Sequence, residues 1–286
     1  MPLPFLKMHG AGNDFVIFDA RTRPVALAPS RLQEIAARRT GIGCDQVIVM
    51  EQSQNADVFM RIYNADGGEV FSCGNATRCV GWLIMRESGR DACAIETKAG
   101  ILQCRRAGQD RIRVDMGKPR LEWGEVPLSH PADTNHLDIA VEGLKDPAAV
   151  SMGNPHMVFA VSDVSAAPVA VLGPTLEHHL LFPERANVSF AQVVNDKEIR
   201  LRVWERGAGE TLACGTAACA TLVALHRRGL VANKASVHLP GGVLEIEWDK
   251  ISGHVWMTGP VALSFQGVIP AEWRGLVNGD PEDNHV

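Results

Sequence analysis

Two stretches of the sequence, MRIYNADGGEVFSCGNA (residues 60–76) and LRVWERGAGETLACGTA (residues 201–217), align without a gap at an offset of 141 residues. Each stretch ends in a Cys-Gly pair, Cys73–Gly74 in the first and Cys214–Gly215 in the second. GNDFVIF falls on GNPHMVF and VDM falls on VWM at the same offset. Matches at one long offset predict an internal repeat, so the chain is expected to consist of two related halves.

The join between the halves is expected within residues 118–145, a stretch with three prolines and many polar residues. We therefore predict an N-terminal domain over residues 1–118 and a C-terminal domain over residues 119–286. The residues from about 264 onward could return to the N-terminal half, and residues 270–286 have the composition of a flexible polar tail.

The repeat also predicts local structure. VFMRIY (58–63) and IRLRVW (199–204) are rich in strand-forming residues, and the second alternates apolar and polar side chains. A helical pattern follows each Cys-Gly pair and stops at a glycine, Gly89 or Gly229. Each repeated cysteine is thus expected where a loop enters a helix.

Composition and charge narrow the class of protein. The 286 residues are 46% hydrophobic and 21% charged, which is typical of a folded globular protein. The formal net charge of −5 gives no electrostatic reason to expect nucleic-acid or membrane partners. The sequence shows no signal-peptide pattern and no apolar run long enough to span a bilayer, so a cytoplasmic location is expected.

The seven cysteines do not form a disulfide or metal pattern. Their number is odd and none is part of a C-x-x-C pair. Cys79 and Cys219 fall within the predicted helices and are expected in the core, and ordinary burial is expected for Cys44, Cys93 and Cys104. Cys73 and Cys214 remain as candidates for chemistry.

A cysteine at a helix start has two chemical uses. The unpaired N–H groups and the helix dipole can lower a thiol pKa from about 8.5 to about 3.5–7.5, and they can also bind a carboxylate. Two such thiols facing each other across a cleft would remove a proton from one side of a carbon and return one to the other. The same residues leave two alternatives open: a redox protein with a reversible Cys73–Cys214 disulfide, and a duplicated scaffold without activity.

Several motifs resemble those of the diaminopimelate epimerase family, over nearly the whole chain. They are MHGAGNDFVIFD (8–19), GIGCDQVI (41–48), YNADGGEVFSCGNATRC (63–79), ETKAG (96–100), MGNPHMVF (152–159), RANVSFAQVV (185–194) and WERGAGETLACGTAACA (204–220). The resemblance implies epimerisation of LL-diaminopimelate to meso-diaminopimelate, a step of lysine and peptidoglycan precursor synthesis. It also implies an α+β fold of two pseudo-symmetric domains, each a curved, barrel-like mixed or antiparallel sheet around a central helix, with the active site in the interdomain cleft.

The resemblance further implies the roles of individual residues. Cys73 and Cys214 would be the acid and base, and His156 and Glu205 would adjust their protonation. Contacts to the substrate are implied for Asn13, Gln46, Asn64, Gly74, Asn75, Asn154, Asn187, Glu205, Arg206, Gly215 and Thr216. No metal and no cofactor are expected, and a homodimer is implied. A two-thiol racemase of another amino acid, such as proline, is the alternative enzyme, and it would not need Arg206 to bind a second carboxylate. Asp14 and Glu69 are expected to support turns outside the site.

Overall fold

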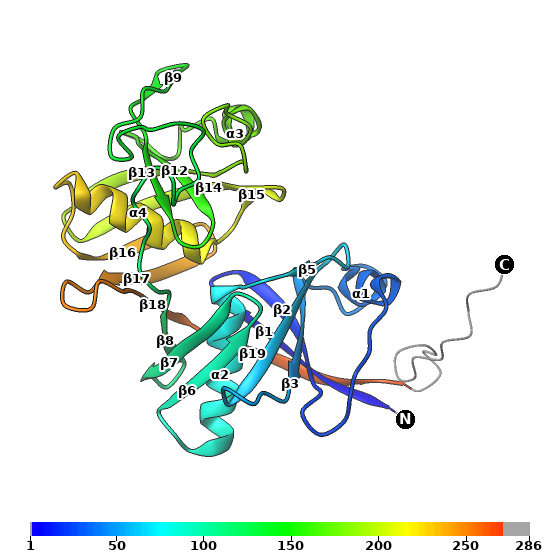
Figure 1. Ribbon diagram of the computed structural model, residues 1–286. Helices are drawn as coiled ribbons and strands as arrows, with labels where there is room; N and C mark the ends of the chain where they lie inside the picture. Colours follow the sequence, from blue (N-terminus) through cyan, green and yellow to red (C-terminus); the bar gives the residue numbers. More distant parts are fainter. Residues whose placement is uncertain (1, 271–286) are drawn as a thin grey trace. The chain divides into compact units, whose positions relative to one another are not determined.

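The structure, a computed structural model, describes residues 2–270 and divides into two units (Figure 1). One unit comprises residues 1–112 and 261–286, and the other comprises residues 113–260. The tail predicted for residues 270–286 lies, apart from Pro270, outside the described residues. Within residues 2–270, none of the helices has the length and apolar character needed to cross a membrane.

The first unit is built mainly from strands. They are β1 (Leu3–Gly10), β2 (Asn13–Asp19), β3 (Gln46–Glu51), β4 (Val58–Asn64), β5 (Glu69–Val70), β6 (Ala92–Thr97), β7 (Gly100–Gly108) and β19 (Ala262–Ile269). Helix α1 (Pro29–Ala36) lies between β2 and β3, and helix α2 (Gly74–Ser88) lies between β5 and β6. Strand β8 (Arg111–Asp115) includes the last residues before the second unit. In hydrogen-bonding order, β19, β1 and β2 pair antiparallel, β2 and β3 pair parallel, and β3 and β4 pair antiparallel. Strand β6 pairs parallel with β4, and β7 forms an antiparallel hairpin with β6.

The second unit repeats this plan. Its strands are β9 (Ala140–Val141), β10 (Leu144–Lys145), β11 (Ala148–Ser151), β12 (Pro155–Ala160), β13 (Asn187–Asn195), β14 (Glu198–Glu205), β15 (Gly209–Thr211), β16 (Lys234–Leu239), β17 (Gly242–Trp248) and β18 (Val255–Pro260), and its helices are α3 (Val169–Glu177) and α4 (Gly215–Arg227). Strands β11 to β14, β16 and β17 pair in the same order and directions as β1 to β4, β6 and β7.

The strand registers of the two units match as well. Tyr63 faces Glu69 across β4 and β5, and Trp204, 141 residues later than Tyr63, faces Glu210 across β14 and β15. Gln46 pairs with Phe15 across β3 and β2, just as Asn187 pairs with His156 across β13 and β12. The offset found in the sequence is therefore a true structural repeat.

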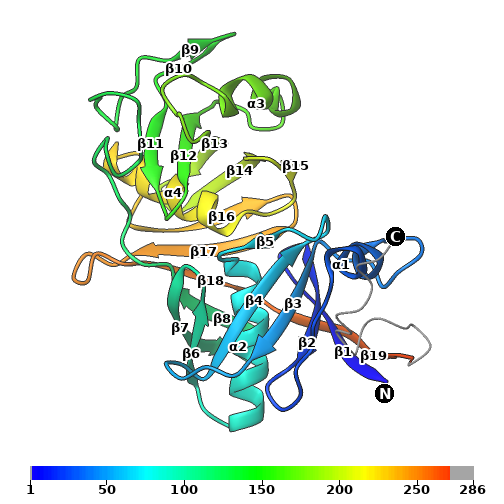
Figure 2. The ribbon, with the colours of Figure 1, turned by 45° about the vertical axis from the view of Figure 1, so that its right-hand side comes forward.

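Each sheet curves around one helix. Helix α2 packs against β1 and also against β6 and β7, which lie several strands away in the hydrogen-bonded order. A flat sheet with a strand spacing of about 4.8 Å would place these strands about 20 Å apart, farther than a helix about 10 Å wide can reach. The sheet must therefore curl, and Figure 2 shows α2 lying along the strands of its unit. Helix α4 likewise packs against β11, β12, β13, β16, β17 and β18. The predicted α+β fold with a central helix in each half is confirmed.

The predicted local elements are confirmed too. The strand patterns form β4 and β14, and Ile199, Leu201 and Val203 are all buried. Helix α2 ends at Gly89, whose φ of 71° is the left-handed conformation that glycine adopts easily. Helix α4 carries small and apolar side chains on all its faces, GTAACATLVAL, and all except the half-buried Thr216 are buried because the sheet surrounds the helix.

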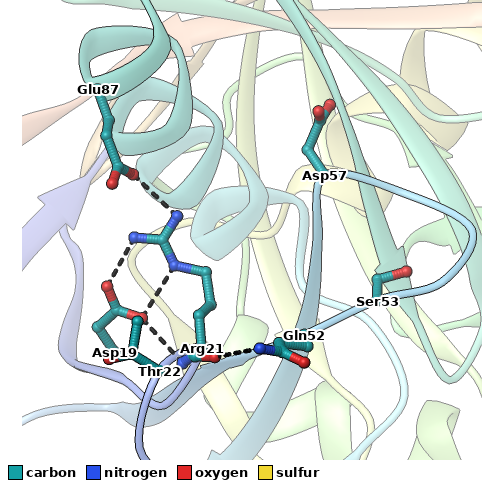
Figure 3. A pocket seen from close by; sticks show the side chains of 7 residues that line it. All are labelled: Asp19, Arg21, Thr22, Gln52, Ser53, Asp57 and Glu87. Carbon is teal, nitrogen blue, oxygen red and sulfur yellow. Dashed lines mark hydrogen bonds and ion pairs between the residues drawn. The ribbon is translucent and has the colours of Figure 1, made fainter.

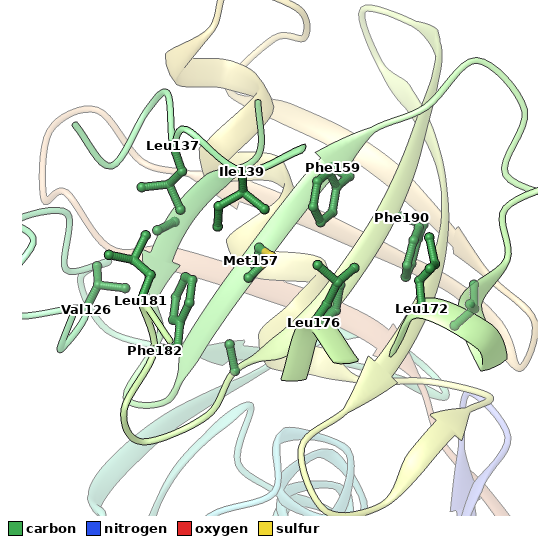
Figure 4. Close-up of a cluster of buried hydrophobic side chains, with 14 of the residues drawn as sticks. Val126, Leu137, Ile139, Met157, Phe159, Leu172, Leu176, Leu181, Phe182 and Phe190 are labelled. Carbon is green, nitrogen blue, oxygen red and sulfur yellow. The ribbon is translucent and has the colours of Figure 1, made fainter. Parts of the chain in front are cut away.

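A second helix in each unit covers part of the sheet. Leu32 and Ile35 of α1 join a buried cluster with Val16, Phe18 and Val47 of the sheet. Leu172 and Leu176 of α3 join the corresponding cluster of the second unit, which is shown in Figure 4. Within that cluster the Phe159 and Phe190 rings stack with centroids 6.1 Å apart. These short helices were not predicted from the sequence.

Candidate active site

Cys73 lies at the start of helix α2. It is the N-cap residue in an extended conformation, with φ −149°, and its Sγ accepts the N–H of Ala76 at 3.5 Å. Thr77 Oγ1 donates to the Cys73 carbonyl at 2.8 Å and fixes the turn from the other side. The side chain is partly exposed. A helix N-terminus stabilises negative charge, so this position favours a thiol that can ionise.

Cys214 holds the same place at the start of α4 but in a different environment. It is only 6% exposed, and burial together with the negative charge of Glu205 raises its pKa well above the usual thiol value. Thr216 Oγ1 at 3.5 Å and the N–H of Ala217 act in the opposite direction and do not outweigh these effects. The sequence suggested that a helix start would lower both thiol pKa values. For Cys214 this was wrong, because the loss of hydration costs the thiolate more than the helix dipole returns.

Two of the predicted amides gather beside Cys73. Asn13, the first residue of β2, places its Oδ1 3.8 Å from Cys73 Sγ and 3.4 Å from Asn75 Nδ2. Asn75 is 3% exposed and is held in the first turn of α2. Gln46 and Asn64, opposite each other on β3 and β4, form a separate pair in which Gln46 Nε2 donates to Asn64 Oδ1 at 2.9 Å.

The amides of the second unit form a chain that leads to Cys214. His156 Nε2 lies 3.0 Å from Asn154 Oδ1, and Asn154 Nδ2 donates to Thr216 Oγ1 at 3.4 Å. Thr216 in turn contacts the thiol of Cys214. Burial, with a smaller contribution from the positive charge of Arg206, lowers the pKa of His156 to about 3. The imidazole is therefore neutral and can act through this hydrogen bond but not as a cation.

The predicted Glu205–Arg206 pair lies at the end of β14. Glu205 Oε1 accepts a hydrogen bond from the hydroxyl of Thr211, and the negative charge of Glu205 raises the pKa of Cys214. Two hydrogen bonds hold Arg206 in place. Its backbone N–H donates to Asn187 Oδ1 at 3.0 Å, and its Nη1 donates to the Glu184 carbonyl at 2.7 Å. Asn187 also donates from Nδ2 to the Pro155 carbonyl at 3.1 Å. Arg206 as a whole residue is half-buried.

Gly74 and Gly215 open the two helices directly after the cysteines. The N–H groups of a first helical turn have no acceptor within the helix, so they are available to an anion. A carboxylate at either turn would lie beside the thiol of the same unit.

A network of charged residues that the sequence did not predict surrounds Asn13. Asp45 Oδ2 accepts from Asn13 Nδ2 at 2.8 Å, and Asp14 is bound by Lys7 at 2.5 Å and by Arg38 at 2.8 Å. Burial alone would raise the pKa of Asp14, but the hydrogen bonds from Arg38 and Lys7 hold it well below its usual range. Asp14 and Asp45 adjoin the predicted residues Asn13 and Gln46 in sequence, and this adjacency was the available signal.

The remaining cysteines are buried, as expected. Cys79 and Cys219 are fully buried in their helices, and burial raises the pKa of Cys79 to about 12. Cys93 and Cys104 are opposite each other on β6 and β7 with their thiols in contact, a pairing that the repeat did not indicate. All seven are free thiols.

A polar surface pocket of about 390 Å³ in the first unit is separate from these residues (Figure 3). It is lined by Asp19 at the end of β2 and by Glu87 in the last turn of α2, whereas Cys73 precedes the first turn of the same 15-residue helix. At 1.5 Å per residue the two ends of α2 are about 20 Å apart. Arg21 lies between Asp19 and Glu87 and pairs with both, so it offsets part of their negative charge.

Comparison with known proteins identifies the family. The model of the diaminopimelate epimerase family matches residues 5–122 and 148–264. The diaminopimelate epimerase of Phenylobacterium zucineum is 54% identical over 274 residues, covering 94% of this chain and 99% of the relative. That of Acidiphilium cryptum is 53% identical over 268 residues, covering 94% and 96%.

Solved structures share the fold. A phenazine biosynthesis protein of the PhzF family from Bacillus anthracis has a TM-score of 0.67 at 18% identity, covering 94% of this chain and 99% of that one. A hydroxyproline epimerase from Agrobacterium vitis has a TM-score of 0.66 at 15% identity, covering 94% and 91%. At such identities the likeness concerns the fold alone. The sequence relatives and the family model go further, and they show that this chain belongs to the diaminopimelate epimerase family.

Proposed function

We propose that the protein converts LL-diaminopimelate to meso-diaminopimelate by a two-thiol reaction without a cofactor, with Cys73 and Cys214 as base and acid. The observation that carries this proposal is the matched position of the two thiols, each an N-cap residue at the start of the central helix of its unit. Membership of the family and relatives more than 50% identical, all diaminopimelate epimerases by name, supply the substrate.

The chemistry requires one proton acceptor and one proton donor. The thiolate of Cys73 removes the α-proton, so that the C–H bond breaks, an S–H bond forms and the electron pair stays on the α-carbon. The S–H of Cys214 protonates the opposite face and leaves Cys214 as the thiolate, ready for the reverse reaction. The raised pKa of Cys214 supports its role as donor in the first direction.

The α-carboxylate would bind at the first turns of α2 and α4, through the N–H groups of Gly74–Asn75 and Gly215–Thr216. Positive charge there also stabilises the electron pair left on the adjacent carbon. Arg206 would bind the carboxylate at the far end of the substrate with two parallel hydrogen bonds. Its backbone anchor to Asn187 and the bond from Nη1 to Glu184 support this role, because they restrict the motion of the side chain.

The other substrate contacts stay predictions at this stage: Asn13, Gln46, Asn64, Asn154, Asn187 and Glu205. The amide groups of the asparagines and of Gln46 can accept from an ammonium group and donate to a carboxylate, and the carboxylate of Glu205 can accept from an ammonium group, which suits a substrate with both at each end. We also propose a cytoplasmic location, since seven free cysteines and a thiol mechanism fit a reducing compartment. A homodimer remains a prediction.

The test is to incubate the reduced protein with LL-diaminopimelate in D2O without cofactor and to follow the α-proton by NMR. We expect loss of the α-proton signal as the meso isomer forms. Cys73→Ala and Cys214→Ala should each reduce inversion by about 10²–10⁴-fold, the usual contribution of a general acid or base.

Cys93→Ala serves as the matched control, because Cys93 is a buried thiol of the first unit that lies in strand β6 and not at a helix start. It should keep normal turnover. No exchange with diaminopimelate by the reduced protein, with exchange of proline instead, would contradict the assigned substrate. Full activity of either alanine variant at position 73 or 214 would contradict the two-thiol reaction.

A further inference from the structure

The charged network beside Asn13 controls which end of an amide faces Cys73. Asp45 binds three groups, all of them donors: Asn13 Nδ2 at 2.8 Å, the backbone N–H of Asp14 at 3.0 Å and Arg38 Nη2 at 2.6 Å. A carboxylate can only accept hydrogen bonds, so the oxygen of the Asn13 amide cannot turn toward Asp45 without placing two acceptors together. The amide nitrogen therefore faces Asp45.

This orientation decides what Cys73 meets. With its nitrogen bound to Asp45, Asn13 presents Oδ1 to Cys73 Sγ at 3.8 Å and to Asn75 Nδ2 at 3.4 Å. An amide oxygen accepts the S–H of a thiol, whereas an amide nitrogen would donate to a thiolate. The orientation therefore favours the protonated form of Cys73 over the ionised form.

The network is built to hold Asp45 in place. Asp14 Oδ1 accepts the backbone N–H of Asp45 at 2.9 Å, so the two aspartates bind each other's backbone reciprocally. Arg38 bridges both carboxylates, and Lys7, 7% exposed, binds Asp14 and the carbonyl of Gly43. Nearly all of this holds the segment before β3 against the start of β2, and only the bond to Asn13 Nδ2 extends to the thiol.

In the second unit a different residue orients the equivalent amide, and the amide points the opposite way. Asn154 is the equivalent of Asn13, and its Oδ1 faces His156, so its Nδ2 donates to Thr216 Oγ1, which in turn contacts the thiol of Cys214. Residues 155 and 186, the equivalents of Asp14 and Asp45, are proline and alanine. The acidic network is thus particular to the unit of Cys73.

We propose that Asp45 is a positioning residue that fixes the orientation of the Asn13 amide and thereby restrains ionisation of the Cys73 thiol. The proposal rests on the role of Cys73 in the proposed function. A thiolate that forms less readily is a stronger base, so the restraint suits a thiol that must remove a weakly acidic proton. It also makes Cys73 less reactive while no substrate is bound.

The experiment measures the rate at which iodoacetamide alkylates Cys73 in the full-length reduced protein at neutral pH. Trypsin releases the peptide of residues 62–78, in which Cys73 is the sole cysteine, so mass spectrometry reports this thiol separately. In Asp45→Ala the amide can turn its nitrogen to the sulfur. We expect alkylation to become about three- to tenfold faster, the range that one hydrogen bond confers.

Two variants distinguish this effect from simpler ones. Asp57→Ala is the matched control, because Asp57 also accepts from one backbone N–H, that of Ala94, and from one arginine, Arg90, but does not bind an amide beside the thiol. It should leave the alkylation rate unchanged. Asp45→Asn retains an oxygen for Asn13 when its amide nitrogen points outward, where Arg38 is 58% exposed and can move away. It should stay within about twofold of the wild type.

Each outcome decides the proposal. Faster alkylation in Asp45→Ala alone supports control by amide orientation. Equal acceleration in Asp45→Ala and Asp45→Asn would overturn it in favour of a simple charge effect, and equal acceleration in Asp57→Ala would overturn it in favour of general loosening. No acceleration in any variant would also overturn it. The readout does not depend on turnover, so a failure of the two-thiol reaction would show separately, as activity in Cys73→Ala.

Discussion

The two units have the same strand order and register, yet the groups around their central thiols differ in charge. Beside Asn13 the first unit has Asp14 and Asp45 with their cationic partners, whereas the second unit has Pro155 and Ala186. A duplicated scaffold has thus retained backbone positions while exchanging the ionisable groups. The difference teaches that symmetry supplies two thiols at equivalent places, whereas the charged and polar groups beside each thiol are particular to its unit.

The strand ends differ in the same way. Asn64 ends β4 and Ala65 follows it in the first unit, whereas Glu205 ends β14 and Arg206 follows it in the second. Burial and the negative charge of Glu205 raise the pKa of Cys214, and Arg206 is the cation that we propose for a second carboxylate. A substrate with two amino-acid ends needs symmetric treatment only at the reacting carbon, and the proposed role of Arg206 would assign binding of its far end to the second unit.

Among the differences between the units, the largest effect is expected from Arg206→Ala, which introduces the alanine that the first unit has at the equivalent position, Ala65. Two charged hydrogen bonds of about 1.5–3 kcal/mol each would be lost, so kcat/KM for diaminopimelate should fall by about 10²–10³-fold or more. Arg200→Ala, at an exposed position of the same strand, should leave the constant near the wild-type value. Equal kcat/KM values for Arg206→Ala and Arg200→Ala would contradict a role of Arg206 in substrate binding.

The sequence allowed prediction of the elements whose signal is local. Alternation predicted β14, and the apolar run closed by Gly89 predicted α2. The curling of each sheet around its helix depends on contacts between strands far apart in the chain, which no local pattern contains. Helix α1 was missed because it spans only Pro29–Ala36, with no side-chain cap at its start.

The candidate site was predictable to a similar extent. The repeat and the motifs pointed to both thiols and to Asn13 and Asn154, since these residues recur at one offset. Lys7 and Arg38 lie outside the repeated motifs, and their role depends on where three separate segments meet. The direction of the Cys214 pKa could not be inferred either, because it is set by burial, and burial follows from the packed fold.

A packing difference between the units gives the next prediction. Leu32 of α1 corresponds to Gly173 of α3, and Tyr63 corresponds to Trp204, so the second unit combines a larger ring with a smaller helix residue. A Cβ at Gly173 would lie 2.4 Å from the Trp204 ring, which cannot shift easily because its Nε1 donates to Glu177 at 2.8 Å. Gly173→Ala should therefore lower the free energy of unfolding by about 1–3 kcal/mol.

Urea unfolding measures this effect. Gly124→Ala is the control within the same unit, because a Cβ there meets no atom within 4 Å. The double variant Gly173→Ala/Trp204→Tyr, which follows the size pattern of the first unit, should recover part of the loss. An unchanged unfolding midpoint in Gly173→Ala would mean that α3 moves freely over the sheet and that the ring does not fix its position.

The smallest effect concerns the pH dependence of stability. It distinguishes His156, which binds the amide of Asn154, from Asp45, which binds the amide of Asn13. Burial holds the pKa of His156 near 3, whereas an unfolded histidine titrates near 6.5. Between these values the unfolded chain binds a proton that the folded chain does not, so stability is complete above about pH 6.5 and falls as the pH drops toward 3. The first unit has Phe15 at the equivalent position and contributes no such loss.

From pH 7 to about pH 5.5, the free energy of unfolding of the wild type should fall by about 1 kcal/mol more than that of His156→Gln, since every other titrating group is common to both. Parallel curves of unfolding free energy against pH would show that the imidazole of His156 is hydrated enough to ionise in the folded protein, and Asn154 would then be oriented by a cation, much as Asn13 is oriented by a carboxylate.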